Sequence, residues 1–340
     1  MPVSHWDIFL VPLQMLIGVY LVVGCGAFFR RMNWYPAPAE TPLYKLTVWV
    51  LMPCLIFERI LPASELIGDY QNLILPPIIG LAATGIGALL GFSVGILPKK
   101  LTGLQNWKTL GTFAACVSIL NYGFVPIPLI TALYDAHDKT QAVLFIQNLG
   151  SELSIWTVVI ISMSGAINRK TLLRAINPPT CAIVLAMMIN QLGIYPYIPR
   201  FAMNAVKLLG DASLPASMFI VGISIADAFD WQRMCRHWRR GIRIAFWSCL
   251  LRLVVLPAIF IAVAVYAPLT IEIRRVLVIH AAMSSAIFPM VLSRHYDGDP
   301  ATAFDTILPN SILALITLPI WTILGLSLIH GEPFGNIFAS

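Results

Sequence analysis

Four side chains that can carry a charge or a proton lie within long apolar stretches of this sequence. They are Glu152, Asp211, Arg252 and His280. Ionisable groups are costly inside a membrane, and those found there commonly mark ion or substrate pathways. Glu152 could change its protonation during a functional cycle, or it could be a structural carboxyl paired with Arg252, and the sequence leaves both open. His280 could titrate near neutral pH, although a buried core histidine is the simpler interpretation.

A fifth polar group precedes a pair of helix breakers. Asn121 and Gly123 come shortly before Pro126 and Pro128. The two prolines remove backbone donors and clash with preceding carbonyls, and glycine weakens the helix further. Broken backbone at membrane depth is tolerated only where it is buried in protein or lines a wet cavity. We therefore expect a break at which the Asn121 amide can both donate and accept, with a simple proline kink as the alternative.

A second stretch, residues 280–290, is suited to crossing the first. Its small side chains allow close backbone approach, and Pro289 ends or kinks the helix. If two broken helices cross near the middle of a membrane, the N-terminal ends of their second halves offer unpaired donors and partial positive charge to an anion. The predicted substrate-binding residues are Asn121, Gly123, Pro126, Ser284, Ser285 and Pro289.

The elements that must position these residues are membrane helices. Hydrophobic residues make up 58% of the chain and charged residues 11%, against roughly a quarter charged in soluble proteins. Windows of about 20 apolar residues predict ten segments, near 8–28, 43–61, 73–97, 110–132, 141–164, 179–196, 202–227, 244–267, 273–293 and 303–329. Neither lysine nor arginine precedes Arg30, so signal-peptide cleavage is not expected. The six cysteines are scattered without a Cys-x-x-Cys pair, which predicts neither a metal site nor a disulfide framework, and no cofactor is implied.

Matched residues recur in the two halves of the chain. The pairs are Pro53 and Pro215 (215 − 53 = 162), Pro126 and Pro289 (289 − 126 = 163), and Asn148 and Asn310 (310 − 148 = 162). Paired interruptions in two membrane halves point to a transporter binding site. Five segments per half is an odd number, so the second repeat would enter from the opposite side. We predict a first repeat over 1–164, a cytoplasmic connection over 165–178, and an inverted second repeat over 179–340.

Basic residues predict the orientation. Fifteen lie in or beside the connections after odd-numbered segments, and six after even-numbered ones. The first group is Arg30, Arg31, Lys45, Lys99, Lys100, Lys108, Arg169, Lys170, Arg174, Arg233, Arg236, Arg239, Arg240, Arg243 and Arg294, and the second is Arg59, Lys139, Arg200, Lys207, Arg274 and Arg275. By the positive-inside rule, the odd connections are cytoplasmic and both termini face outward. The basic run Trp231 to Arg243 then suits anionic lipid better than nucleic acid.

Several stretches together resemble the auxin efflux carrier family. They are Asn121-Tyr122-Gly123-Phe124 before Pro126-Ile127-Pro128-Leu129, Leu209-Gly210-Asp211-Ala212-Ser213-Leu214-Pro215, Arg252 before Leu253-Val254-Val255-Leu256-Pro257, and Ala281-Ala282-Met283 leading to Tyr296-Asp297-Gly298-Asp299-Pro300. The resemblance spans almost the whole chain. It implies ten helices in inverted five-helix repeats with broken, crossing fourth and ninth helices, and the short central connection is similar to prokaryotic members. The chain departs from the family at Ser284, Ser285 and Phe288, so the resemblance supports the fourth-helix asparagine more than a ninth-helix polar ligand.

The resulting hypothesis is an all-α polytopic protein of the inner cell membrane that carries a small organic anion by alternating access. Glu152, Asp211, Arg252, Asn148 and Asn310 are its candidate coupling or structural groups, and proton or sodium coupling and a homodimer remain open. An intramembrane enzyme and a membrane sensor or scaffold are the alternatives. The sequence has no nucleotide-binding, Gly-x-Ser-x-Gly or His-Glu-x-x-His motif, so no catalytic residue is predicted.

Overall fold

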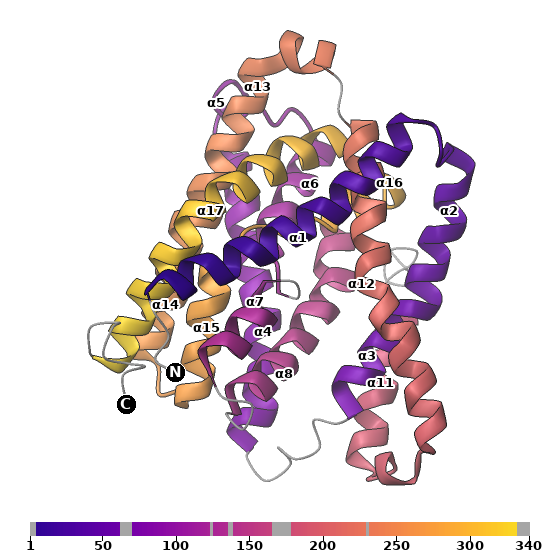
Figure 1. Cartoon of the computed structure of the whole chain (residues 1–340). Coiled ribbons are helices and arrows are strands. Elements are labelled where there is room, and N and C mark those ends of the chain that lie inside the picture. Colours follow the sequence, from indigo (N-terminus) through magenta and orange to yellow (C-terminus); the bar gives the residue numbers. More distant parts are fainter. Residues whose placement is uncertain are drawn as a thin grey trace.

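The computed structural model describes residues 5–61, 70–122, 125–134, 139–164, 178–228 and 231–331, and this part of the chain is helical throughout apart from turns and short extended segments (Figure 1). The elements are α1 (His5–Arg31), α2 (Ala37–Leu46), η1 (Thr47–Leu51), α3 (Met52–Ile60), α4 (Tyr70–Ser93), η3 (Val94–Ile96), α5 (Lys99–Thr102), α6 (Trp107–Ser118), α7 (Pro126–Leu133), α8 (Lys139–Ser154), η4 (Ile155–Val159), α9 (Ile160–Ser164), α11 (Pro178–Gln191), η5 (Tyr195–Tyr197), α12 (Arg200–Ala228), α13 (Trp231–Leu250), η6 (Leu251–Val255), α14 (Leu256–Tyr266), α15 (Ile271–Ala282), α16 (Pro289–His295) and α17 (Pro300–His330).

Five helical spans of the described residues are long and apolar enough to cross a membrane. They are Gln71–Ile96, Val143–Ser164, Arg200–Asp227, His237–Tyr266 and Pro300–His330. Two of the other predicted segments are each divided into shorter helices, α6 with α7 and α15 with α16. A length criterion misses such segments because neither half reaches the roughly 20 residues that a membrane requires.

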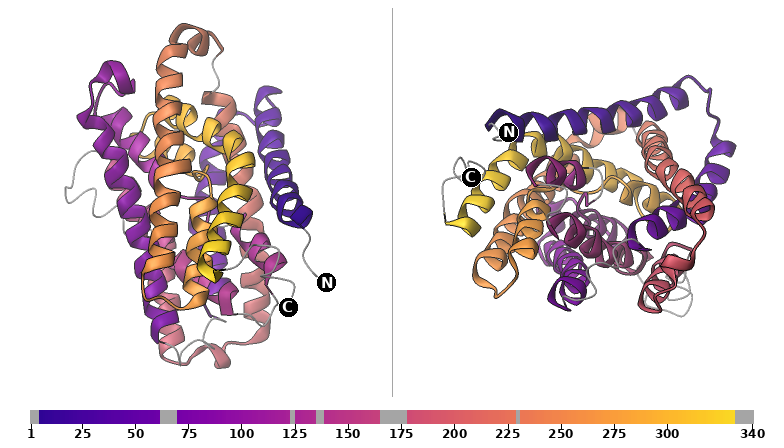
Figure 2. Two further views of the ribbon diagram at one scale, coloured as in Figure 1. Left: turned by 90° about the vertical axis from the view of Figure 1, so that its left-hand side faces the viewer. Right: turned by 60° about the horizontal axis from the view of Figure 1, so that its bottom comes forward.

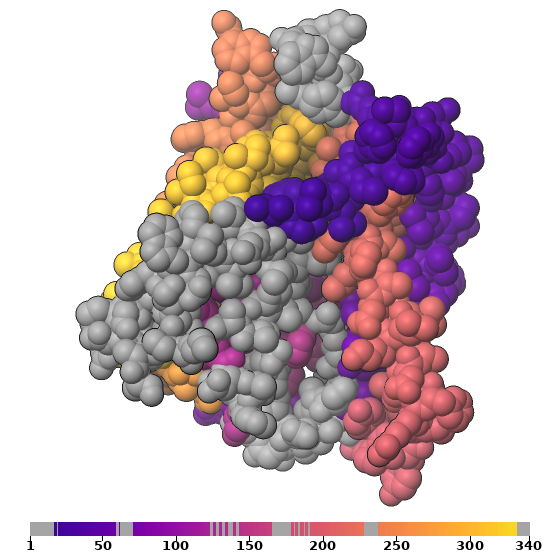
Figure 3. Space-filling model, in the orientation of Figure 1, coloured from indigo at the N-terminus to yellow at the C-terminus, as the bar shows by residue number. Residues whose placement is uncertain are grey.

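The helices form two bundles that lie side by side (Figures 1 and 2). We call α1, α2, η1, α3, α11 and α12 the small bundle, and α4 to α9 with α13 to α17 the large bundle. Glycines permit close helix packing in each bundle. A methyl group at Gly222 would collide with the carbonyl of Val23 between α12 and α1, and one at Gly150 would collide with the carbonyl of Pro77 between α8 and α4. By their membership, both bundles contain helices from the two halves of the chain. Figure 3 shows the later part of α1, in indigo, between α17 and α12 on one face of the protein.

Some prolines lie in helical segments without breaking them. Pro257 follows the π-helical turn η6, and the carbonyl of Leu253, four residues earlier, accepts a hydrogen bond from the Trp321 indole at 2.7 Å. A proline cannot donate to that carbonyl, so the tryptophan of α17 satisfies it. Pro53 likewise follows a π-helical turn, η1, and Pro215 lies inside the continuous helix α12. The matched prolines at 53 and 215 therefore do not mark breaks.

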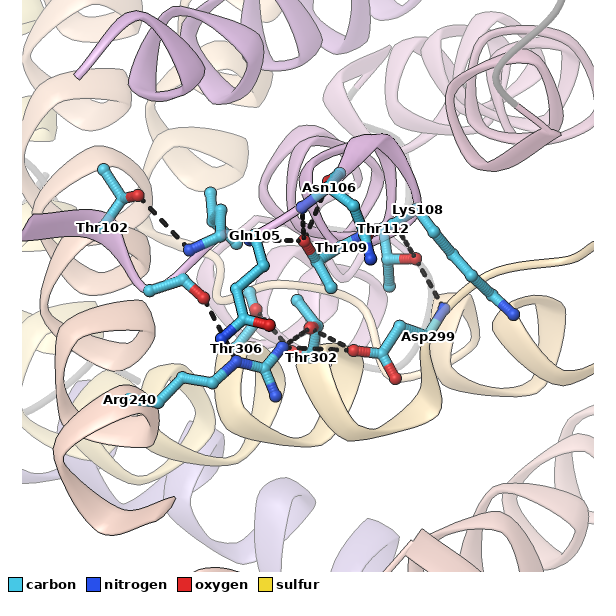
Figure 4. Close-up of polar contacts among 12 residues, drawn as sticks. Thr102, Gln105, Asn106, Lys108, Thr109, Thr112, Arg240, Asp299, Thr302 and Thr306 are labelled. Carbon is cyan, nitrogen blue, oxygen red and sulfur yellow. Dashed lines mark hydrogen bonds and ion pairs between the residues drawn. The ribbon is translucent and has the colours of Figure 1, made fainter. Parts of the chain in front are cut away.

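Contacts between connections gather at two ends of the protein. At one end Arg240 of α13 donates to the carbonyl of Gly103 at 3.1 Å and to the carboxylate of Asp299, which precedes α17, at 3.3 Å (Figure 4). The backbone amide of Asp299 in turn donates to the hydroxyl of Thr112 at 2.8 Å. These residues follow the third, seventh and ninth predicted segments or begin the fourth. At the other end Thr270 donates to Asn72 at 2.6 Å. Connections after odd-numbered segments thus lie at one end, and those after the second and eighth segments lie at the other. A chain that crosses back and forth between two surfaces requires this alternation.

Candidate functional site

The two broken helices cross through their extended segments. Leu120 and Ser285 form an isolated antiparallel bridge. The amide of Asn121 donates to the carbonyl of Ser284 at 2.9 Å, and that of Ala286 donates to the carbonyl of Ile119 at 2.8 Å. Backbone groups freed by the breaks thus satisfy one another, as a membrane interior demands. The breaks expected before Pro126 and Pro289 are present, and the continuous-kink alternative is wrong at both places.

A cavity lies beside this crossing, between the two bundles. Its volume is about 120 Å³, and one water needs roughly 10–15 Å³ on this measure, so it can hold a small organic molecule. The small bundle contributes Val23, Met52, Leu55, Ile56, Ser213, Leu214, Ser217, Met218 and Val221, and the large bundle contributes Leu120, Asn121, Tyr122, Phe145, Asn148, Leu149, Glu152, Ile155, Ala286, Ile287 and Phe288. The lining is mainly apolar with a few convergent polar groups, which is typical of a small-molecule site.

Three of the predicted site residues meet on the large-bundle wall. Asn148 donates to the carbonyl of Tyr122 at 3.1 Å, and the Tyr122 hydroxyl donates to Glu152 at 2.5 Å. Asn121 stands beside them at the crossing and is 6% exposed. Asn148 and Glu152 are four residues apart on α8 and so lie on one face. The tyrosine that links them to the broken helix was not among the predicted site residues.

The small-bundle wall adds two serines that sequence reasoning missed. Ser213 and Ser217 lie one turn apart on α12, both line the cavity, and both are buried. Within the described part of the chain their hydroxyls have no hydrogen-bond partner. Serine pairs four residues apart on a membrane helix are a weak signal, because serine there often bonds its own backbone. Their position opposite Asn121 and Asn148 makes them candidate site residues.

The other predicted residues lie elsewhere or fall outside the description. Ser284 and Ser285 belong to the crossing but do not line the cavity, while Pro126 and Pro289 begin α7 and α16. Gly123 lies outside the described residues.

Two of the candidate coupling or structural groups also lie away from the cavity. Asp211 is exposed on α12. Asn310 is buried and donates to Ser248 at 3.0 Å and to the carbonyl of Thr306 at 2.8 Å, so it fixes α17 against α13.

The alternative in which Glu152 pairs with Arg252 is wrong. Arg252 is 1% exposed, and its guanidinium donates instead to the carbonyls of Met283 at 3.0 Å and His280 at 3.4 Å. The His280 ring meets the side-chain amide of Gln147 at 2.8 Å. Arg252 is therefore bound by carbonyls at the end of α15, and His280 is bound by Gln147 of α8. None of these groups lines the cavity.

A charged cluster joins the two bundles at one end. Arg294 of α16 lies 2.9 Å from Glu40 and 3.0 Å from Asp227, and Asp227 also accepts from Arg30 at 2.7 Å. Only Arg294 belongs to the large bundle, and we call these four residues the Arg294 cluster. The adjacent His295 stacks on Tyr44 of α2 with ring centroids 3.9 Å apart. The end of α16 is therefore held against the small bundle by ion pairs and by an aromatic contact.

The protonation of this cluster follows from its burial. Burial raises the pKa of Glu40, and the positive charge of Arg294 opposes that rise. The hydrogen bond to Asp227 raises the pKa of Arg30. Burial and the neighbouring Arg294 both lower the pKa of His295, which favours the neutral ring that stacks on Tyr44.

Comparison with known proteins agrees with this architecture. A family model described as membrane transport protein matches residues 12–171 and again residues 162–322, as an internal repeat predicts. An uncharacterized transporter of Methanothermobacter thermautotrophicus is 23% identical over 317 residues, covering 93% of this chain and 99% of that protein. An uncharacterized transporter of Methanocaldococcus jannaschii is 21% identical over 316 residues, covering 92% and 98%.

A plant protein matches over a shorter region. Auxin efflux carrier component 3 of Arabidopsis thaliana is 26% identical over 130 residues, which is 38% of this chain and 19% of the plant protein. The two matches to the family model together span most of the sequence, and the crossing helices lie within them. The chain therefore belongs to the membrane transport protein family, that of the auxin efflux carriers, and is a multi-pass membrane transporter rather than an enzyme.

Proposed function

We propose that this protein is a secondary carrier that moves a small organic anion, such as a carboxylate, by alternating access. The observation that carries the proposal is the cavity between the two bundles, beside the crossing of the broken helices. A site between two bodies can be exposed to either side of the membrane if the bodies move relative to one another.

The polar groups of the cavity suit a carboxylate. The amides of Asn121 and Asn148 and the hydroxyls of Ser213 and Ser217 can each donate to an oxygen. The helix α7 begins just beyond the crossing, and its N-terminal end carries partial positive charge. The apolar lining would enclose the hydrocarbon part of the substrate.

Glu152 suggests how transport is coupled. It is the charged side chain among the described residues that line the cavity. Two nearby carboxylates disfavour the doubly ionised state, so an anion beside Glu152 should bind together with a proton. Proton-coupled movement is therefore our first expectation for the driving ion.

Ten membrane crossings in two inverted repeats remain our proposal for the topology. The gathering of connection contacts at two ends supports it, because Arg30, Glu40, Asp227 and Arg294 all border odd-numbered connections and meet at one end. The proposed domain division and the outward-facing termini rest on the same reasoning. Single cysteines at Ser4 and Gln232 should react with an impermeant reagent from opposite sides of the membrane, and labelling from one side would reject the ten-crossing topology.

The direct test of function is solute flux. The purified protein in proteoliposomes should accumulate or release one member of a panel of labelled carboxylates, and the rate should respond to an imposed proton gradient. Empty liposomes and the Asn121→Ala protein are the controls. Absence of flux for every compound tested, with correct insertion, would favour a sensor or scaffold.

A further inference from the structure

Arg252 places a permanent positive charge in the middle of the membrane-spanning part of the large bundle. It lies 15 residues from one end of the span His237–Tyr266 and 14 from the other (252 − 237 and 266 − 252). At about 1.5 Å per residue, roughly 20 Å of helix separates it from either end. A side chain 1% exposed at that depth must be compensated by protein groups.

The compensation comes from a helix end. The guanidinium donates through Nε to the carbonyl of Met283 and through Nη2 to that of His280, where α15 stops at Ala282. The last carbonyls of a helix have no partner within the helix and carry partial negative charge. Arg252 forms no ion pair with any described residue, so these carbonyls are its counter-charge.

Carriers with broken helices often use such carbonyls differently. Unwound backbone carbonyls and the C-terminal ends of half-helices coordinate Na⁺ beside the substrate site. Here the guanidinium of Arg252 donates hydrogen bonds to the carbonyls at the end of α15. We propose that Arg252 is a built-in cation of the helix crossing, which holds the end of α15 in place of a coupling Na⁺.

The proposal makes the crossing independent of sodium. Only the link between the crossing and the transport cycle rests on the proposed function. The effect of sodium on the stability of the fold can be measured without any substrate. Arg252 acts as a positioning residue: it fixes Met283, which leads into the extended segment that pairs with the fourth-segment break through Ser284 and Ser285.

The experiment compares thermal unfolding of the purified full-length protein in detergent with NaCl or choline chloride at equal ionic strength. The parent should unfold at the same temperature in both salts. Arg252→Met, which removes the positive charge and both guanidinium bonds from the end of α15, should unfold several degrees lower, and Na⁺ should restore part of the loss selectively. Arg252→Lys keeps the charge and should stay close to the parent in both salts.

The chain offers a matched control. Arg274 donates to the carbonyls of Leu269 and Ala267 at 3.0 and 3.2 Å just after α14, which is the same kind of contact near the membrane surface. Arg274→Met should lose less stability and gain no sodium response. A saturable rise of the parent unfolding temperature with Na⁺, or an Arg252→Met protein as stable as the parent in choline chloride, would overturn the proposal.

Discussion

Breaking the Arg294 cluster should allow the two bundles to part at that end. Arg294 makes two ion pairs to the small bundle, at 2.9 Å to Glu40 and 3.0 Å to Asp227, and the three side chains are 24%, 7% and 27% exposed. Exposed pairs are worth about 0.2–1 kcal/mol, whereas breaking a fully buried pair costs about 3–5 kcal/mol. Because these side chains are partly buried, Arg294→Gln should cost about 2 kcal/mol of the free energy that holds the two bundles together at this end. This corresponds to about a 30-fold change in the ratio of the closed to the open arrangement.

Cysteine accessibility measures that ratio. Ser217 lines the cavity on α12, so a cysteine placed there in a cysteine-free chain reports whether the cavity can be reached. In oriented vesicles an impermeant maleimide added on the Arg294 side should label the parent slowly. The Arg294→Gln protein should be labelled faster, with an upper bound near the 30-fold shift. Adding Glu40→Gln to that variant should change the rate little further, because the ion pair is already lost.

The matched control is Arg239→Gln. Arg239 also lies at this end, but its guanidinium contacts the Trp238 ring of its own helix, with 5.6 Å to the ring centroid. Removing that charge alters the surface potential without separating the bundles. Equal labelling rates in the Arg239→Gln and Arg294→Gln proteins, or fast labelling of the parent, would refute the assignment of Arg294 to the closed end.

Three other predictions test the site and the fold. Asn121→Ala should leave the prolines and the fold intact and weaken substrate binding about ten- to a hundred-fold, the worth of a buried hydrogen bond to a charged group, as measured by equilibrium binding; unchanged affinity would remove Asn121 from the site. Glu152→Gln should flatten the pH dependence of transport in proteoliposomes, and a retained pH profile with full activity would make Glu152 structural. Trp321→Phe should lower the free energy of unfolding by about 1–2 kcal/mol, but by less in a Pro257→Ala background, where alanine supplies the missing donor; equal losses in both backgrounds would contradict the account of the π-helical turn.

The breaks in the two crossing helices could be predicted because their causes are local. Pro126 and Pro289 lack an amide hydrogen and come a few residues after small or polar residues, so a continuous helix through either stretch is unfavourable. Pro53 and Pro215 have the same chemistry in a similar repeat position, yet their helices continue. A π-helical turn precedes Pro53, and such local adjustments depend on neighbouring helices. Spacing alone therefore overestimates the number of breaks.

The site was predictable on one wall and hidden on the other. Asn121, Asn148 and Glu152 could be identified because a polar group in an apolar segment is conspicuous. Ser213 and Ser217 are less conspicuous, and only the packing of α12 against the cavity identifies them as candidates. The pairing of Glu152 with Arg252 failed as an alternative because carbonyls at the end of α15 compensate the arginine, and sequence gives no signal for such a partner.

Two halves with matched elements contribute different chemistry to one cavity. Asn148 lines it, whereas Asn310, at the matched position, is buried in hydrogen bonds between α17 and α13. The crossing segment of the second half adds Ala286, Ile287 and Phe288, which are apolar. A substrate that satisfied the amides with its charged group would therefore place its hydrocarbon part toward Phe288. If the protein carries an organic anion as proposed, we expect it to favour anions with an apolar body over small dicarboxylates, whose second charge would face the apolar side chains of Ala286, Ile287 and Phe288.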